Sequence, residues 1–448
     1  MAKKKDSTNS QKGTSADDTS LSVEDLLLNA LKRGDDSAQT GRYLVTYKGG
    51  SAKDALKSLQ TTQGMRIADA RDFEGQAITL ENAGDADAVF LPEINVALIS
   101  SNAAQERGMG TQMEIATNNL IESIAPEYFA FTDYSNQHFT ERTEGITNEY
   151  LRGFQRAAEM IAQNGQPGNA NQQTETEEDV QVLGVTWGLK ACKVPPSLYS
   201  GAGIKVAVLG SGFDLGHPDF LGRTVVSQTF VGQPVQDLYG HATHMIGTAC
   251  GPRVPAGAIP RYGIGFRSAI FVGKVLSNSG SGTMGSVLAG MNWAIANRCP
   301  VIFASVGGPG GPHPAYTAAG QAALNNGCLL MAGASSSGSS VGAPANSPTI
   351  MSVGAVGKTL QPASFSPIGK IDIVAPGVDI FSSYPRPQLY RTWSGIASAT
   401  AHVAGCAALW ADISPNLRGP MLKQRLLARA KPLPFPINRI GAGLVQAP

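Results

Sequence analysis

Short apolar runs alternate with helical segments along the C-terminal part of the chain. Four predominantly apolar runs have the length of strands that are buried on both faces. They lie at 204–209, 269–275, 301–305 and 328–332. Segments with helical spacing lie between them, for instance at 284–297 and 314–325. This alternation predicts a mostly parallel sheet that helices cover on both faces, which is an α/β fold.

The first 40 residues contain one short segment with helical periodicity. Residues 1–20 are polar and are expected to be disordered. Ser22 and Asp25 open the next segment like a capping box, with Asp in place of the usual Glu, and apolar residues recur at helical spacing from Val23 to Leu31. The helix could dock on the body of the protein or bind a partner. We favour docking, because an isolated helix of this length is marginally stable.

Residues 41–131 are predicted to form a separate small α+β domain. The domain begins with a strand at 42–48, which is rich in aromatic and β-branched residues. The pattern then predicts a helix at 52–60, a strand at 96–99, a helix at 113–124 and an extended segment at 127–131. Residues 132–180 are predicted to be a linker with a helix at 148–164 and a flexible stretch after it. Residues 181–448 would then form the large α/β domain.

The composition favours a compact α/β protein and gives no sign of a polyanionic partner. The 448 residues are 42% hydrophobic and 15% charged, with 52 glycines, which argues against a disordered or fibrous chain. The formal net charge is +1, so nothing indicates binding to nucleic acid or to an anionic membrane surface. The basic run at residues 3–5 is not followed by an apolar stretch, and no transmembrane segment is predicted, so we expect a cytoplasmic protein. The five cysteines lack metal-ligand spacing and are expected to be reduced and mostly buried.

Several blocks of sequence occur in the order found in one protease family. Residues 206–214 read Val-Ala-Val-Leu-Gly-Ser-Gly-Phe-Asp, and residues 240–248 read Gly-His-Ala-Thr-His-Met-Ile-Gly-Thr. Residues 395–405 read Gly-Ile-Ala-Ser-Ala-Thr-Ala-His-Val-Ala-Gly. These blocks resemble the motifs of the subtilases, the subtilisin-like serine proteases, over about residues 185–430. The resemblance implies a subtilisin-like three-layer fold, and it makes the segment 41–131 similar in position and element order to the inhibitory pro-domain of this family.

The resemblance implies four catalytic positions, of which the chain keeps one. The chemistry requires a hydroxyl nucleophile, an imidazole base, a carboxylate that orients the imidazole, and an amide donor to the oxyanion. His241 stands at the imidazole position. The carboxylate position is Gly210, the serine position is Ala397 and the oxyanion asparagine position is Ala334. Since a methyl group has no lone pair with which to attack a carbonyl, we expect the chain to be proteolytically inactive as written.

Neighbouring polar residues are not expected to replace these groups. Ser398 follows Ala397, but near the start of a helix a shift of one residue swings the side chain about 100° away. Asp214 lies beyond the end of the strand that Gly210 closes. Ser335 could reach the oxyanion region, but a hydroxyl there restores nothing without a nucleophile.

The substrate groove does not depend on the catalytic side chains. In subtilases two extended segments flank the bound peptide, and the resemblance assigns them to Gly280-Ser281-Gly282 and to Ser305-Val306-Gly307. Backbone pairing needs no nucleophile, so these segments could still bind an extended peptide or a protein segment. The alternative is that the tail of the chain's own pro-domain, or the linker, permanently fills the groove.

No cofactor is expected. Asp219 matches a calcium ligand of the family, but the loop at 253–261 that should add further ligands contains no Asp or Asn. Calcium is therefore improbable at this place, because it takes about six or more oxygen ligands.

Three functions are compatible with this sequence. The first, which we favour, is a natural pseudoprotease that binds a peptide or partner without cutting it, because an experimenter who disarms a protease usually changes one residue rather than three. The second is a genuine subtilisin-like endopeptidase that was inactivated by engineering and kept as its uncleaved pro-form. The third is a structural scaffold in which the groove plays no part. We expect the pro-domain to stay covalently attached, because Ala397 cannot cut the chain.

Overall fold

The computed structural model describes most of the chain. The described residues are 22–32, 38–49, 52–62, 64–73, 79–80, 82–106, 120–132, 184–304, 306–308, 310–334 and 340–448. The disorder expected at 1–20, the helix expected at 148–164, Ser305 and Ser335 lie outside these residues.

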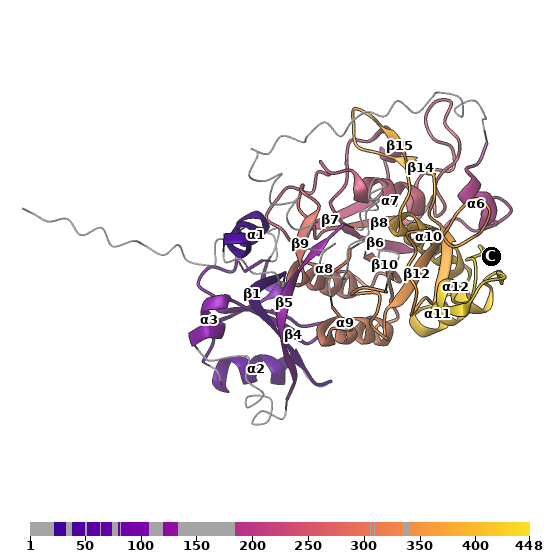
Figure 1. Ribbon diagram of the computed structural model, residues 1–448. Helices are drawn as coiled ribbons and strands as arrows, with labels where there is room; N and C mark the ends of the chain where they lie inside the picture. The colour runs from indigo at the N-terminus through magenta and orange to yellow at the C-terminus, as the bar shows by residue number, and fades with distance from the viewer. Residues whose placement is uncertain are drawn as a thin grey trace, which may run out of the picture.

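A seven-stranded parallel sheet forms the centre of the C-terminal part (Figure 1). Its strands, in spatial order, are β13 (Ile373–Pro376), β12 (Met351–Val356), β11 (Leu329–Gly333), β10 (Val301–Ala304), β6 (Lys205–Gly210), β8 (Ala269–Lys274) and β7 (Val225–Thr229). All neighbouring strands run parallel. The four strands predicted from apolar runs are confirmed as β6, β8, β10 and β11. The pattern missed β12, β13 and the half-exposed edge strand β7.

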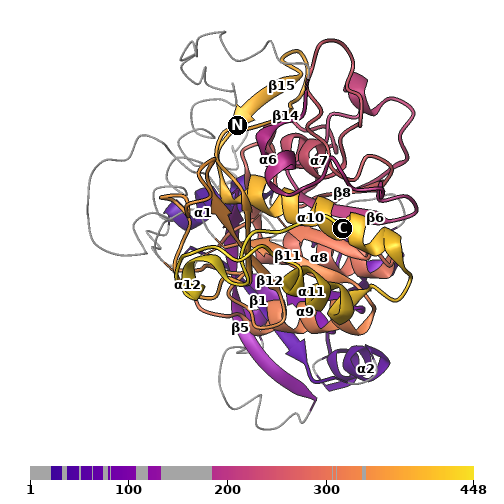
Figure 2. The same ribbon diagram turned by 90° about the vertical axis from the view of Figure 1, so that its right-hand side faces the viewer.

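Helices cover both faces of this sheet, as predicted. The larger ones are α7 (His241–Cys250), α8 (Met284–Ala296), α9 (Pro314–Asn325), α10 (Ile396–Ile413) and α11 (Gly419–Ala428). The shorter elements are α6 (Trp187–Ala191), α12 (Ile437–Ile440), the 3₁₀ turn η4 (Pro218–Phe220) and the hairpin of β14 (Ile380–Ser383) and β15 (Tyr390–Trp393). Each face of the sheet packs on its helices through an apolar core, and alternate residues of each strand point into the two cores. Val206 of β6 packs with α7 and α10 on one face, and Ala207 packs with α8 and α9 on the other. The result is a three-layer α/β fold, in which α10 runs across the sheet (Figure 2).

Helix α10 is strongly apolar because it is buried in the core of the protein. Among the described residues it is the one helix long and apolar enough to cross a membrane, and 89% of its apolar window is buried inside the protein.

A second sheet in the N-terminal part recruits a strand from the C-terminal part. Its strands, in spatial order, are β2 (Ile67–Asp69), β3 (Ala88–Leu91), β4 (Val96–Ile99), β1 (Gln39–Tyr47), β5 (Ile121–Phe131) and β9 (Ser281–Thr283). Helices α2 (Ala52–Thr62) and α3 (Ser101–Glu106) cover one face, and η2 (Ala70–Asp72) follows β2. The other face packs on α8, so the two sheets share that helix.

The helix predicted at 113–124 is wrong at its C-terminal end. Residues 121–124 belong to β5, and Ile124 pairs with Val45 of β1. Ile121 and Ile124 have helical spacing, but antiparallel pairing with β1 decides the conformation. Residues 113–119 of the predicted helix lie outside the described residues, and the described helix that precedes β5 is α3, which begins at Ser101.

The short N-terminal helix docks on the body of the protein, as favoured from the sequence. It is α1 (Val23–Lys32). The Ser22 N–H donates to Asp25 Oδ2 at 3.1 Å, and the Asp25 N–H donates to Ser22 Oγ at 3.2 Å, which is the expected capping box. Leu26 and Leu27 are buried. The five cysteines are likewise buried and unpaired, as expected.

Candidate active site

The four expected catalytic positions lie at the ends of elements around one edge of the parallel sheet. Gly210 ends β6, and Ala334 directly follows β11, so both lie at the carboxyl edge. His241 is the first residue of α7 and Ala397 the second of α10, and these two helices pack against each other. The carboxyl edge of a parallel sheet is where α/β proteins place their ligands.

The space beside Gly210 is occupied by another side chain. A Cβ atom on Gly210 would lie 2.9 Å from the Cβ of Ala242. Carbon atoms do not approach this closely unless something shifts. Ala242 stands where the family motif has the glycine that follows the imidazole position. Comparison of the motifs shows this exchange, but its contact with Gly210 emerges only in three dimensions.

His241 is buried among aromatic rings. Its ring lies 5.7 Å from the ring of Trp393 and 6.5 Å from that of Tyr239, between centroids. Burial lowers the pKa of His241 to about 4, although the negative charge of Asp237 acts in the opposite direction. The imidazole is therefore neutral at pH 7. Neither aromatic neighbour was predicted from the sequence motifs.

Asp237 supplies a buried carboxylate near His241, but its hydrogen bonds serve the helix start. It accepts the N–H of Gly240 at 2.8 Å. It also accepts the N–H and the hydroxyl of Thr243, at 3.0 and 2.7 Å. These bonds satisfy the first N–H groups of α7, as an N-terminal cap does. Asp237 thus stabilises the turn that presents His241.

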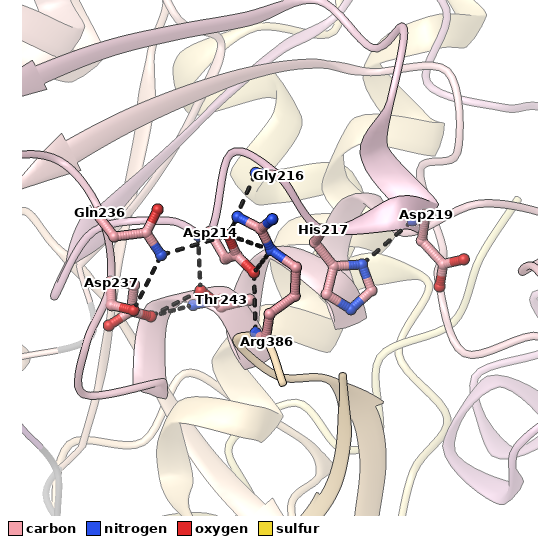
Figure 3. A network of polar contacts seen from close by, with 8 residues as sticks. All are labelled: Asp214, Gly216, His217, Asp219, Gln236, Asp237, Thr243 and Arg386. Carbon is pink, nitrogen blue, oxygen red and sulfur yellow. Dashed lines mark hydrogen bonds and ion pairs between the residues drawn. The ribbon is translucent and has the colours of Figure 1, made fainter. Parts of the chain in front are cut away.

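Asp214 is held in a separate polar network, which Figure 3 shows. The Arg386 side chain donates to Asp214 from Nη2 at 2.8 Å and from Nε at 2.9 Å, and the Arg386 backbone N–H donates at 2.9 Å. Burial acts to raise the pKa of Asp214, but the bonds from Arg386, Gln236 and Gly216 outweigh it and lower the pKa to about 2. The carboxylate ties the loop after β6 to the loop between β14 and β15. It is therefore not available to replace the side chain absent from Gly210.

Ser398 is buried next to Ala397 but is not activated. Within the described residues its hydroxyl has no hydrogen-bond partner. Its carbonyl accepts the Nδ1–H of His402 at 2.8 Å, one turn further along α10. A serine nucleophile requires a base within hydrogen-bonding distance of its hydroxyl. In the described part of the chain, the Ser398 hydroxyl has no such base.

The expected groove is occupied by residues 129–132 of the same chain. On one side β5 pairs with β9, with Ala130 opposite Gly282 and Phe131 opposite Ser281. On the other side Phe131 and Gly307 exchange two N–H···O bonds of 2.9 Å. The Thr132 N–H donates to Gly280 O at 2.9 Å. Residues 129–132 therefore form the middle strand between the two segments expected to bind a peptide.

The remaining expected groove residues differ in their position. Val306 is buried in the core shared with α8, whereas Ser305 lies outside the described residues. Residues 129–132, which we call the tail, also contact the loop before α7, because the hydroxyls of Thr132 and Tyr239 lie 3.1 Å apart. The tail thus ends beside the turn that carries His241.

The calcium site implied at Asp219 does not fit the residues present. Asp219 Oδ1 accepts the N–H of Ala256 at 2.9 Å. Asp219 Oδ2 accepts the hydroxyls of Tyr262 at 2.5 Å and of Tyr390 at 3.0 Å. A calcium ion needs several oxygen ligands with free lone pairs, and no group of three His, Cys, Asp or Glu residues in the described part of the chain could hold a metal ion.

Comparisons with known proteins agree with this architecture. Residues 201–443 match the model of the subtilase family. The chain is 37% identical to subtilisin of Bacillus pumilus over 259 residues, which cover 55% of this chain and 91% of that protein. It is 36% identical to subtilisin NAT of Bacillus subtilis subsp. natto over 259 residues, 55% of this chain and 66% of the relative. It is also 36% identical to an alkaline protease of Shouchella clausii over 282 residues, 60% of this chain and 72% of the relative. The chain belongs to the subtilase family and has the fold of a subtilisin-like serine endopeptidase.

Proposed function

We propose that this chain is a pseudoprotease, a subtilase whose groove binds an extended segment and does not cleave it. The observation that carries the proposal is the pairing of residues 129–132 with both sides of the groove, beside a site in which the serine position is Ala397. The hydrogen bonds of this pairing join main-chain atoms. Recognition of this kind depends on the backbone of the groove and not on a nucleophile.

The expected loss of turnover is large. In subtilisin itself, where the effect has been measured, removal of the serine alone costs about 2 × 10⁶ in kcat, and loss of the other triad members adds little. Loss of the oxyanion asparagine lowers the kcat of an otherwise intact subtilisin by about 10²–10³-fold. With Ala397, Gly210 and Ala334 at these positions, turnover would fall to the background that binding alone supports.

The contact between Gly210 and Ala242 supports a natural pseudoprotease over an engineered protease. An experimenter who removes a catalytic carboxylate has no reason to change the neighbouring glycine of the motif. Here the residue after His241 is Ala242, and its methyl group lies 2.9 Å from the point at which the side chain of an aspartate at position 210 would begin. The engineered alternative therefore requires four changes around the site, one of which has no effect on the chemistry.

Catalytic competence is tested by restoring the family residues. The chain as written should neither react with a fluorophosphonate probe nor digest casein. The variant Gly210→Asp/Ala242→Gly/Ala334→Asn/Ala397→Ser should do both, and the same variant that retains Ala242 should do so less well. Labelling of the chain as written would refute the assignment of Ala397 to the serine position.

Groove binding is tested with a fluorescent peptide that has the sequence of residues 127–136. We expect weak binding to the chain as written, because its own tail competes, and at least tenfold tighter binding to Phe131→Pro, which lacks the N–H that bonds Gly307 O. A peptide N-methylated at the same phenylalanine should not bind. Equal, weak binding of both peptides to both proteins would favour the scaffold alternative.

A further inference from the structure

Helix α1 lies against the segment that fills the groove. Leu27 and Phe129 are fully buried, and they share one apolar cluster with Leu26, Ala30 and Val231. The partly buried Phe131 packs against the same cluster. Figure 1 shows α1 beside β1 and β9, the two strands that pair with β5. The helix therefore contacts the tail at the point where the tail leaves the N-terminal sheet and enters the groove.

A polar bridge connects the helix to the loop that precedes β9, on one wall of the groove. Gln233 Nε2 donates to Glu24 Oε1 of α1 at 3.4 Å. The oxygen of the same amide accepts the Asn278 N–H at 2.8 Å. Asn278 lies two residues before Gly280, which accepts the N–H of Thr132. Helix α1 is thus linked to the tail and to the loop that binds the tail.

The docking of α1 is the kind of contact that can open locally. A ten-residue helix is marginally stable alone, so α1 is held by this apolar cluster and its capping box. A cavity of about 270 Å³ lies beside its first turn, bounded by Val23, Val231 and Leu80 among others. The first turn is therefore less closely packed than the turn that carries Leu27.

We propose that α1 is a latch that holds residues 129–132 in the groove, so that the groove opens only when α1 undocks. When α1 leaves, Phe129 and Val231 lose their apolar cover and the Gln233 bridge loses its partner on the helix. The tail then remains attached by its main-chain bonds to β9, Gly280 and Gly307 and by the contact between the hydroxyls of Thr132 and Tyr239. This inference concerns the chain's own tail and does not require the groove to bind a second chain.

Hydrogen exchange measured by mass spectrometry tests the latch. We expect Leu27→Ala to raise the exchange rate of a peptide spanning residues 127–134 at least tenfold, because the Phe131 and Thr132 amides lose protection when the tail detaches. Lys32→Ala, which changes an exposed residue of the same helix, is the matched control and should leave the rate unchanged. The amides of β10 should exchange at the same rate in all variants.

Two results would overturn the latch. In the first, α1 itself exchanges faster in Leu27→Ala while the tail keeps its protection, which would show that the helix detaches without releasing the tail. In the second, the tail and β10 lose protection equally, which would show that α1 stabilises the whole fold. Val231→Ala removes the opposite side of the same cluster and should reproduce the effect, so the test holds even if Leu27→Ala does not fold. No peptide is added, so the outcome is independent of the proposed binding function.

Discussion

A single methyl group at position 210 should destabilise this protein unless the methyl group of Ala242 is removed. The Cβ of Gly210→Ala would lie 2.9 Å from the Cβ of Ala242, at least 0.5 Å inside the ordinary contact range that begins at 3.4 Å. Overpacking of a buried site costs about 1–3 kcal/mol. The loss of glycine's freedom in the unfolded chain offsets about 0.4–1 kcal/mol of this. We therefore expect Gly210→Ala to lower the free energy of unfolding by about 0.5–2 kcal/mol.

A double-mutant cycle isolates the contact from these other effects. Ala242→Gly alone should cost about 1 kcal/mol of helix propensity and about 0.8 kcal/mol for the buried methyl group. In Gly210→Ala/Ala242→Gly the clash is absent, so the double variant should be more stable than the sum of the single effects predicts, by about 1–3 kcal/mol. The effects on the unfolded state cancel in the cycle, because each change occurs once with and once without the other.

The cycle is measured by urea denaturation followed by near-ultraviolet circular dichroism and tryptophan fluorescence. Gly357→Ala is a suitable control, because its Cβ would meet its nearest neighbour, Val378, at 3.7 Å, an ordinary contact. It should change the free energy of unfolding by less than Gly210→Ala does. If the two changes at 210 and 242 are additive within about 0.5 kcal/mol, Ala242 does not fill the carboxylate position, and Ala242 no longer favours a natural over an engineered loss of the carboxylate.

Three further predictions follow from the site. Removal of divalent ions with EGTA should not lower the melting temperature, and added calcium should not raise it, because the oxygens of Asp219 already accept protein donors. The folded pKa of Asp214, about 2, lies below its unfolded value of about 3.9, so its stabilising contribution is present above pH 4 and is lost as the pH falls towards 2. An acid titration of Asp214→Asn should therefore show a smaller loss of stability in this window than the unaltered chain, and an equal loss would contradict the assignment. Intact-mass spectrometry of the purified chain should give one uncut polypeptide, and a self-generated cut after Thr132 would contradict the predicted inactivity.

The apolar pattern predicted the buried strands well because both faces of this sheet are covered. In β6 and β10 every position from Val206 to Leu209 and from Val301 to Ala304 is buried, so the strands are uninterrupted apolar runs. The edge strand β7 escaped prediction because only one of its neighbours is a strand and its side chains are half-exposed or exposed. In β5, Ile121 and Ile124 suggested a helix because their spacing suits either structure, and the choice depends on β1, about 75 residues earlier in the chain.

The candidate site was predictable as far as the motifs run in sequence. The motifs located Gly210, His241, Ala334 and Ala397, and the structure places all four where sheet strands end or helices begin. Contacts between motifs could not be predicted. Ala242 and Gly210 are 32 residues apart in the sequence. The effect of an alanine in place of the family's glycine can be judged only from the distance between the two Cβ positions in the folded protein. The ring of Trp393 beside His241 depends in the same way on the packing of the β14–β15 hairpin against α7.

Binding and chemistry depend on different atoms in this site. The tail is held by the carbonyl and N–H groups of Gly280 and Gly307 and by pairing with β9, and these are backbone groups fixed by the fold. The positions that we assign to the catalytic groups differ from the family pattern only in side chains, at Gly210, Ala334 and Ala397. Replacement of those side chains leaves every hydrogen bond of the tail in place. A subtilase can therefore lose its nucleophile and retain its groove, which is why we expect recognition of an extended segment to be the property that persists in this chain.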